Sequence, residues 1–246
     1  MLKNNFRKYQ ACFSLAFLLI GSHAIAADVT STPSKTTPYQ AGITMTRSVQ
    51  AGITPDQAIE ILKAGNERFL NNKQLNRDEK TLVTQTALGQ FPFASIVACM
   101  DSRSGPEIVF DLNIGDIFVN RVAGNVINDD IVGGLEYGSK AVGTPLIVVL
   151  GHTNCGAIKG ACDGVELGNL TQLLDKIKPA IQMSKTPGER NGKNYRFVNE
   201  VTELNVDDSI KTIRDKSPIL RDLEKQGKLK IVGAMYDTSK GKVIWR

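Results

Sequence analysis

Short apolar runs alternate with helical patterns from residue 93 to the C-terminus. GKVIW (241–245) follows the turn TSKG and is predicted to be a short edge strand, while residues 129–142 and 209–227 have helical patterns. This alternation predicts an α/β fold with a mainly parallel central β-sheet, flanked by helices and carrying an antiparallel edge strand. Four further runs have the composition of buried parallel strands: FASIVAC (93–99), DIFVNRV (116–122), PLIVVLGH (145–152) and KLKIVGAMYD (228–237).

Regular structure is expected to begin near ITPDQAIEILKAGNERFL (53–70). Thr54 can cap a helix there, Pro55 suits the first helical turn, and Gln57 completes a capping box. The preceding residues, 27–52, begin with a stretch rich in Ser, Thr and Pro that has little to bury, so they are predicted to form a flexible leader. Residues 53–246 are predicted to form a single α/β domain.

The first 26 residues have the layout of a secretory signal peptide. Lys3, Arg7 and Lys8 precede the apolar run ACFSLAFLLI, and Ala24-Ile25-Ala26 supplies a small-x-small cleavage site. The run is about half the length of the ~20 residues that cross a bilayer. We therefore predict cleavage after Ala26 and export to the periplasm or beyond, with no membrane span left in the mature chain.

Net charge and cysteine content argue against two classes of protein, nucleic-acid-binding proteins and disulfide-rich proteins. The whole chain carries a formal charge of +5, but residues 1–26 contribute three basic residues and no acidic one. The remainder is therefore close to neutral, which predicts no nucleic-acid-binding face. Without Cys12, three cysteines remain, and this odd, small number argues against a disulfide framework. Of these three, Cys162 is predicted to be only a small buried residue.

Cys99, His152 and Cys155 form the candidate site. Cys99 and His152 end two predicted strands, and the carboxyl ends of parallel strands meet at one edge of a sheet. Two thiolates and an imidazole suit zinc, and three protein ligands leave a fourth position open, as in catalytic zinc sites. Two other interpretations stay open at this point: a disulfide between Cys99 and Cys155, and a nucleophilic Cys155 with His152 as its base.

Asp101 and Arg103 lie two residues apart, directly after the strand that Cys99 ends. If the chain turns there, the two side chains can pair and hold a carboxylate near the open position of the metal. The alternative is an exposed ion pair, which would contribute little to stability.

CMDSR (99–103) and GHTNCG (151–156) together resemble the C-x-D-x-R and H-x-x-C motifs of the β-class carbonic anhydrases. The resemblance runs from about residue 54 to the C-terminus and includes GDIFVNRVAGN, GGLEYG and SPILRDLEKQGKLKIVGAMYD. It implies the β-carbonic anhydrase fold for a catalytic domain at 53–246, and a homodimer or homotetramer with sites near subunit boundaries. It also implies one Zn²⁺ per subunit on Cys99, His152 and Cys155, with Asp101 and Arg103 orienting the nucleophile.

Further residues of this sequence match pocket residues of the plant-type branch of this family. Gln90 matches an amide that contacts substrate, Phe118 and Tyr137 match pocket aromatics, and the Gly156 backbone matches a position beside the metal. Ala123 stands where that branch has Val, so the pocket is expected to be slightly roomier.

Two departures concern the neighbourhood of Cys99. Ser104 replaces a commoner Val after the arginine. Ile96 replaces a Trp that, in members whose aspartate can ligate zinc, forms part of a second bicarbonate site. Asp101 is therefore expected to stay paired with Arg103.

The resemblance implies reversible hydration of carbon dioxide to bicarbonate and a proton by attack of zinc-bound hydroxide, in an exported bacterial enzyme. Three alternatives remain: a hydrolase of carbon disulfide or carbonyl sulfide on the same fold, a non-catalytic zinc protein, and a thiol-redox protein.

Overall fold

Five strands form one sheet in the order β2-β1-β3-β4-β5 in the computed structural model, which describes residues 37–246. The first four strands in this order run parallel and β5 runs antiparallel to β4, which confirms the predicted α/β fold. The predicted signal peptide lies outside the described residues. The strands are β1 (Ala94–Ala98), β2 (Ile117–Arg121), β3 (Leu146–His152), β4 (Lys230–Tyr236) and β5 (Val243–Trp245).

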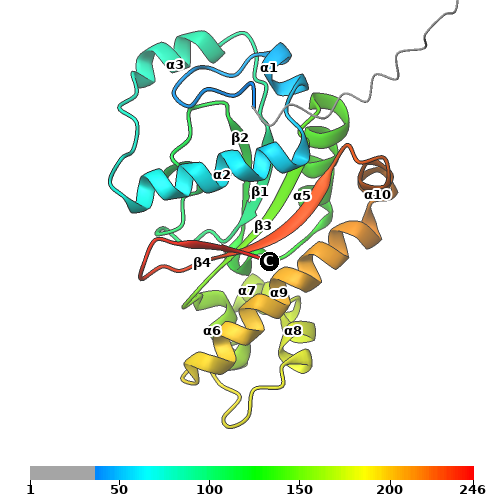
Figure 1. Cartoon of the computed structure of the whole chain (residues 1–246). Coiled ribbons are helices and arrows are strands. Elements are labelled where there is room, and N and C mark those ends of the chain that lie inside the picture. The colour runs from blue at the N-terminus through cyan, green and yellow to red at the C-terminus, as the bar shows by residue number, and fades with distance from the viewer. Residues whose placement is uncertain (1–36) are drawn as a thin grey trace, which may run out of the picture. The chain divides into compact units, whose positions relative to one another are not determined.

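Helices pack on both faces of the sheet (Figure 1). Among residues 37–246, none of them combines the length and the apolar character that crossing a membrane would require. The helices are α1 (Arg47–Ala51), α2 (Pro55–Leu70), α3 (Glu79–Thr86), α4 (Pro106–Val109), α5 (Asp129–Glu136), α6 (Gly156–Cys162), α7 (Gly168–Asp175), α8 (Lys178–Met183), α9 (Tyr195–Lys216) and α10 (Pro218–Lys225), with a 3-10 turn η1 (Ala123–Asn125) and a π-helical turn η2 (Tyr137–Val142).

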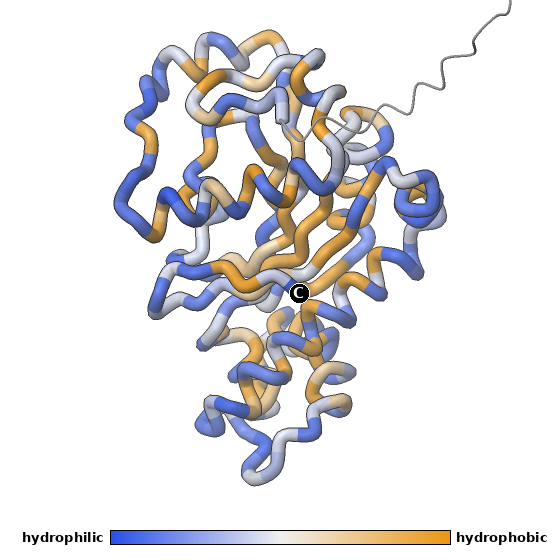
Figure 2. The backbone as a smooth tube through the Cα atoms, in the orientation of Figure 1, coloured by the Kyte–Doolittle hydropathy of each residue, from blue (hydrophilic) through white to orange (hydrophobic). Residues whose placement is uncertain are grey.

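Alternate side chains of β3 enter two different hydrophobic cores, because successive residues of a strand point to opposite faces. Val148 and Leu150 pack in the core that contains Leu62 of α2. Ile147 and Val149 pack in the core formed with α5, α9 and α10. Both faces of the strand are therefore buried, and Figure 2 shows the resulting apolar character along the central strands.

The predicted helices are present, with two changes of detail. Thr54 caps α2 through the predicted capping box with Gln57, and Pro55 opens the helix. The pattern at 209–227 is interrupted where α9 ends at Lys216 and α10 begins at Pro218, because proline has no N–H to continue the preceding helix. Residues 129–142 form α5 followed by η2.

The prediction of a flexible leader up to residue 52 is wrong for its last part. Residues 47–51 form α1, which Thr46 caps. Met45 is buried, and the buried Gln50 side chain donates a hydrogen bond to the Pro92 carbonyl at 2.7 Å. These partners lie about forty residues away in the sequence, so local composition could not reveal them.

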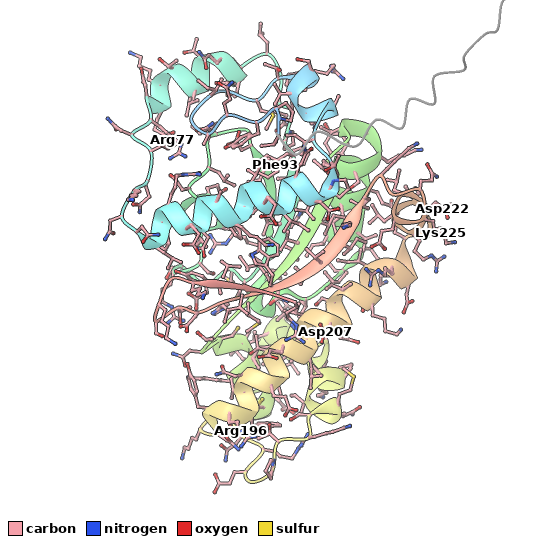
Figure 3. All side chains as sticks on the ribbon, viewed as in Figure 1. Arg77, Phe93, Arg196, Asp207, Asp222 and Lys225 are labelled. Carbon is pink, nitrogen blue, oxygen red and sulfur yellow. The ribbon has the colours of Figure 1, made fainter. Side chains whose placement is uncertain are left out.

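Arg77, labelled in Figure 3, anchors the loop that precedes β2. Its guanidinium donates to Asn113 Oδ1 at 2.7 Å and pairs with Asp111, which Arg68 also contacts. Asp111 is buried and has a positive φ of 46°. Two arginines therefore compensate the burial of this carboxylate and stabilise the start of β2.

Candidate metal centre and active site

Cys99, His152 and Cys155 meet at the carboxyl end of β1 and β3, two neighbouring strands. Cys99 follows β1, His152 is the last residue of β3, and Cys155 is the N-cap residue of α6. One ligand atom from each lies within 4.8 Å of the others, and all three residues are buried. The structure thus brings together the three residues that the sequence predicts as metal ligands.

The two sulfurs are not joined. Cys99 Sγ and Cys155 Sγ lie 3.9 Å apart and both residues are free cysteines. A disulfide bond is about 2.05 Å long, so the disulfide interpretation does not describe this structure. Cys162, at the end of α6, is half-buried rather than buried as predicted.

The His152 ring is oriented by a backbone hydrogen bond. Its Nδ1 lies 3.0 Å from the Thr153 carbonyl, which can only accept, so Nδ1 carries the proton. Nε2 is then an unprotonated acceptor, and it is buried without a hydrogen-bond partner in the described structure. A buried acceptor without a partner is costly, and a metal ion would satisfy it. The donor set of one imidazole nitrogen and two sulfurs therefore fits zinc.

The Cys99 sulfur lies among hydrogen-bond donors. The Cys155 thiol lies within hydrogen-bond distance, and the Gly124 amide donates to Cys99 Sγ at 3.3 Å. The Cys155 contact is the largest cause that lowers the pKa of Cys99, and the Gly124 amide acts in the same direction. The pKa of Cys155 is raised because its proton is held in that contact.

Arg103 holds Asp101 with a two-pronged hydrogen bond. Nε donates to Oδ1 at 2.9 Å, Nη2 donates to Oδ2 at 2.7 Å, and the Arg103 backbone amide adds a third bond to Oδ1 at 3.0 Å. These bonds hold the pKa of Asp101 well below its usual range. Asp101 Oδ2 lies 3.9 Å from His152 Nε2. The pair therefore borders the Cys/His/Cys group and is not an isolated surface ion pair.

Arg121 supports the backbone of the candidate site, and the sequence did not predict this role. From the end of β2 its Nε donates to the Cys99 carbonyl at 3.0 Å, and its Nη2 donates to the Asp101 carbonyl. One guanidinium thus fixes the backbone on both sides of Met100. The available signal was a basic residue near the end of the apolar run DIFVNRV.

Two of the predicted pocket residues lie near the metal ligands and three do not. Ala123 precedes Gly124, and Gly156 directly follows Cys155. Phe118, in contrast, pairs with Ser95 near the start of β1. Cys99 lies beyond the other end of that strand, about 13 Å away at ~3.3 Å per residue.

The remaining two residues lie at the same distant end of the sheet. The Tyr137 ring lies 6.0 Å from the Phe118 ring, and Gln90 is exposed in the segment before β1. A single chain therefore does not bring Gln90, Phe118 and Tyr137 to the Cys/His/Cys group.

Comparisons with known proteins agree with this geometry. The sequence profile of the family described as carbonic anhydrase matches residues 94–243. Carbonic anhydrase 2 of Mycobacterium tuberculosis is 33% identical over 198 residues, which cover 78% of this chain and 93% of that protein. The carbonic anhydrase of Mycolicibacterium smegmatis is 31% identical over 201 residues, with the same coverage.

Solved structures show the same fold. The β-carbonic anhydrase CafA of Aspergillus fumigatus is 26% identical, with a TM-score of 0.59 over 74% of this chain and 88% of that chain. Two tetrameric β-carbonic anhydrases have been described from Sordaria macrospora; the matched chain is 24% identical, with a TM-score of 0.58 over 74% of this chain and 90% of that chain. The fold and the Cys/His/Cys site together define an α/β enzyme with a candidate metal centre. The chain belongs to the β-class carbonic anhydrase family.

Proposed function

We propose that this enzyme catalyses the reversible hydration of carbon dioxide at a zinc ion held by Cys99, His152 and Cys155. The observation that carries the proposal is the buried His152 Nε2, which has no partner in the described structure and belongs to a group with two buried sulfurs. Membership of the carbonic anhydrase family supports the reaction. A zinc ion in this group would lower the pKa of a bound water and so supply a nucleophile at neutral pH.

Asp101 and Arg103 orient the attacking water in this proposal. The carboxylate is ionised at neutral pH, because Arg103 lowers its pKa, and it can therefore only accept hydrogen bonds. An acceptor at the border of the metal group fixes which way the O–H of the water points. Arg103 in turn keeps the carboxylate from rotating toward the ligand atoms.

Measurements on one preparation test this function. The protein should contain one zinc per chain and hydrate carbon dioxide, as followed by stopped flow with a pH indicator. Carbon disulfide and carbonyl sulfide should be assayed alongside. Full zinc occupancy without hydration of carbon dioxide would contradict the proposal, and turnover of the sulfur compounds alone would identify the hydrolase.

The proposal also assigns Gln90, Phe118 and Tyr137 to the site of a neighbouring subunit in a homodimer or homotetramer. It is supported by the distance of the two aromatic residues from Cys99 in their own chain, and by the 55% exposure of Tyr137. β2 lies at an edge of the sheet, so its outer side is available to a second copy.

Subunit complementation tests this assignment. Cys99→Ser chains, inactive alone, and Gln90→Ala chains, weakly active alone, should recover activity when mixed and reassembled, because one site of a mixed dimer then has all its residues. Absence of recovery in verified mixed dimers would place Gln90 outside the site.

The proposal further places the enzyme in the periplasm or outside the cell. Support comes from the basic residues, apolar run and small-x-small site of residues 1–26. Cell fractionation with intact-mass measurement should find a chain that begins near residue 27. A full-length chain in the cytoplasm would contradict export.

A further inference from the structure

The turn that contacts the Cys99 sulfur has an unusual backbone conformation. Gly124 and Asn125 both have positive φ angles, 66° and 44°. The Gly124 amide donates to Cys99 Sγ at 3.3 Å. A Cβ at Gly124 would approach Ile177 Cδ1 to 3.0 Å, so the positive φ and the tight contact both favour glycine here. Two consecutive left-handed residues persist only where neighbouring groups hold them.

The groups that hold this turn come from α9, about eighty residues away in the sequence. Asn205 Nδ2 donates to the Gly124 carbonyl at 2.8 Å, and Ser209 Oγ donates to the Asn125 carbonyl at 3.3 Å. The two side chains are 2% and 4% exposed, and at i and i+4 they share one face of the helix. Asparagine is a poor helix former, so a buried asparagine within α9 indicates a specific role.

A second glycine lets α9 approach closely enough for these contacts. Gly151 precedes His152 in β3, and a Cβ there would lie 2.7 Å from Val206 Cγ2 of α9. The same sheet–helix packing therefore places Asn205 on the turn and His152 in the metal group.

We infer that Asn205 is a positioning residue for the metal centre, which acts through the Gly124 peptide on the sulfur of Cys99, with Ser209 in support. The inference rests on the metal site proposed above. An N–H···S hydrogen bond withdraws electron density from a thiolate, and so limits the charge that the sulfur donates to a metal. Without Asn205, the Gly124 carbonyl would lose its buried partner. The turn would then relax and carry the Gly124 amide away from Cys99.

The test compares Asn205→Leu with a matched control on the same helix. Leucine is close to asparagine in size but cannot donate a hydrogen bond. The control is Thr202→Val, because Thr202 is also buried and its hydroxyl donates only within α9, to the Val198 carbonyl at 2.8 Å. Both full-length variants and the wild type are prepared with zinc and, in parallel, with cobalt(II).

In Asn205→Leu we expect the sulfur-to-cobalt charge-transfer band to shift to longer wavelength, because the thiolate becomes a stronger donor. Because the relaxed turn no longer holds Cys99 in position, release of zinc to a chromogenic chelator should accelerate roughly tenfold, the lower end of what loss of an outer hydrogen-bond partner does to metal sites. Thr202→Val should match the wild type in both measurements. A purely structural role for Asn205 would move the melting temperature without moving the band.

An unshifted band and an unchanged release rate in folded Asn205→Leu would overturn the inference, as would an equal shift in Thr202→Val. If Asn205→Leu does not fold, Ser209→Ala takes its place in the test. Its charge-transfer band should shift in the same direction but by less, and a spectrum identical to the wild type would contradict the inference. A wild-type protein that binds neither metal would overturn the proposed function itself, and this outcome is visible before any variant is measured.

Discussion

Arg103 engages both carboxylate oxygens of Asp101, while Oδ2 of that carboxylate lies 3.9 Å from His152 Nε2. Asp101 thus lies beside the Cys/His/Cys group, but both of its carboxylate oxygens accept hydrogen bonds from the Arg103 guanidinium. This pairing is the one expected from Ile96, and the prediction that Asp101 keeps it when a metal is bound remains to be tested. The fork geometry of the guanidinium makes the pairing specific to arginine.

Arg103→Lys should therefore be a damaging substitution. An ammonium group cannot bond both oxygens in one plane, so Asp101 is expected to move toward the metal, and hydration should fall roughly 10–100-fold with zinc retained. Stopped-flow assays and metal analysis measure the two effects. Arg196→Lys, at an exposed arginine near the start of α9 (Figure 3), is the matched control and should leave both unchanged.

Zinc X-ray absorption at pH 7 gives the corresponding structural readout. The wild type should show two sulfur ligands, one nitrogen and one exchangeable oxygen. A crystal structure at that pH with Asp101 directly on zinc would refute the prediction that the fourth zinc position is open to water. The assignment of the enzyme would stand.

Substitution of any metal ligand should remove both zinc and activity. Cys99→Ser, His152→Ala and Cys155→Ser each leave two of the three side chains that the structure brings within 4.8 Å. Inductively coupled plasma mass spectrometry gives the zinc content. Cys162→Ser is the control, because this free cysteine lies outside the group and its loss should change neither quantity. Near-normal activity in one ligand variant would remove that residue from the site.

Asp116 should make the stability of the fold depend on pH below neutrality. The residue is fully buried, and desolvation is the main cause that raises its pKa from 3.8 to about 6, against hydrogen bonds from the Asn113 amide and from Tyr39. Because the folded pKa is the higher one, the protonated carboxyl stabilises the fold below pH 4, and this contribution is lost as the pH rises through about 6. Two pKa units correspond to about 3 kcal/mol.

Asp116→Asn is the variant that measures this contribution. The amide stays neutral, so the unfolding free energy of the variant relative to wild type should increase between pH 4 and pH 7, as followed by urea denaturation. A constant difference across that range would show that Asp116 does not titrate as described. Tyr39→Phe removes a hydrogen bond that favours the carboxylate, and should move the transition to higher pH.

Proton release should limit turnover in weak buffer. Within residues 27–246 the only histidine is His152, whose ring belongs to the metal group. No second imidazole is available in that part of the chain to carry protons near neutral pH. The maximal rate of hydration should therefore rise with the concentration of an imidazole buffer at constant pH and ionic strength. A flat response would point to a route through water and carboxylates that is already fast.

The sequence by itself determined the sheet, the α2 cap and the three candidate ligands. These features depend on neighbours along the chain: apolar runs define strands, and Thr54 and Gln57 meet within one turn. Cys99 follows the end of one strand and His152 ends the next one in the sheet, and parallel pairing brings these ends together. Local chemistry is enough for them because a strand or a cap is specified within a few residues.

Only the tertiary structure decided which residues support the site. Asn205 reaches Gly124 across 81 positions, and Arg121 reaches Cys99 from a neighbouring strand. Tertiary packing also ordered α1 and placed Phe118 at the far end of β1 from Cys99. Such contacts depend on how closely helices and strands approach, as at Gly151, and on burial that no local pattern encodes.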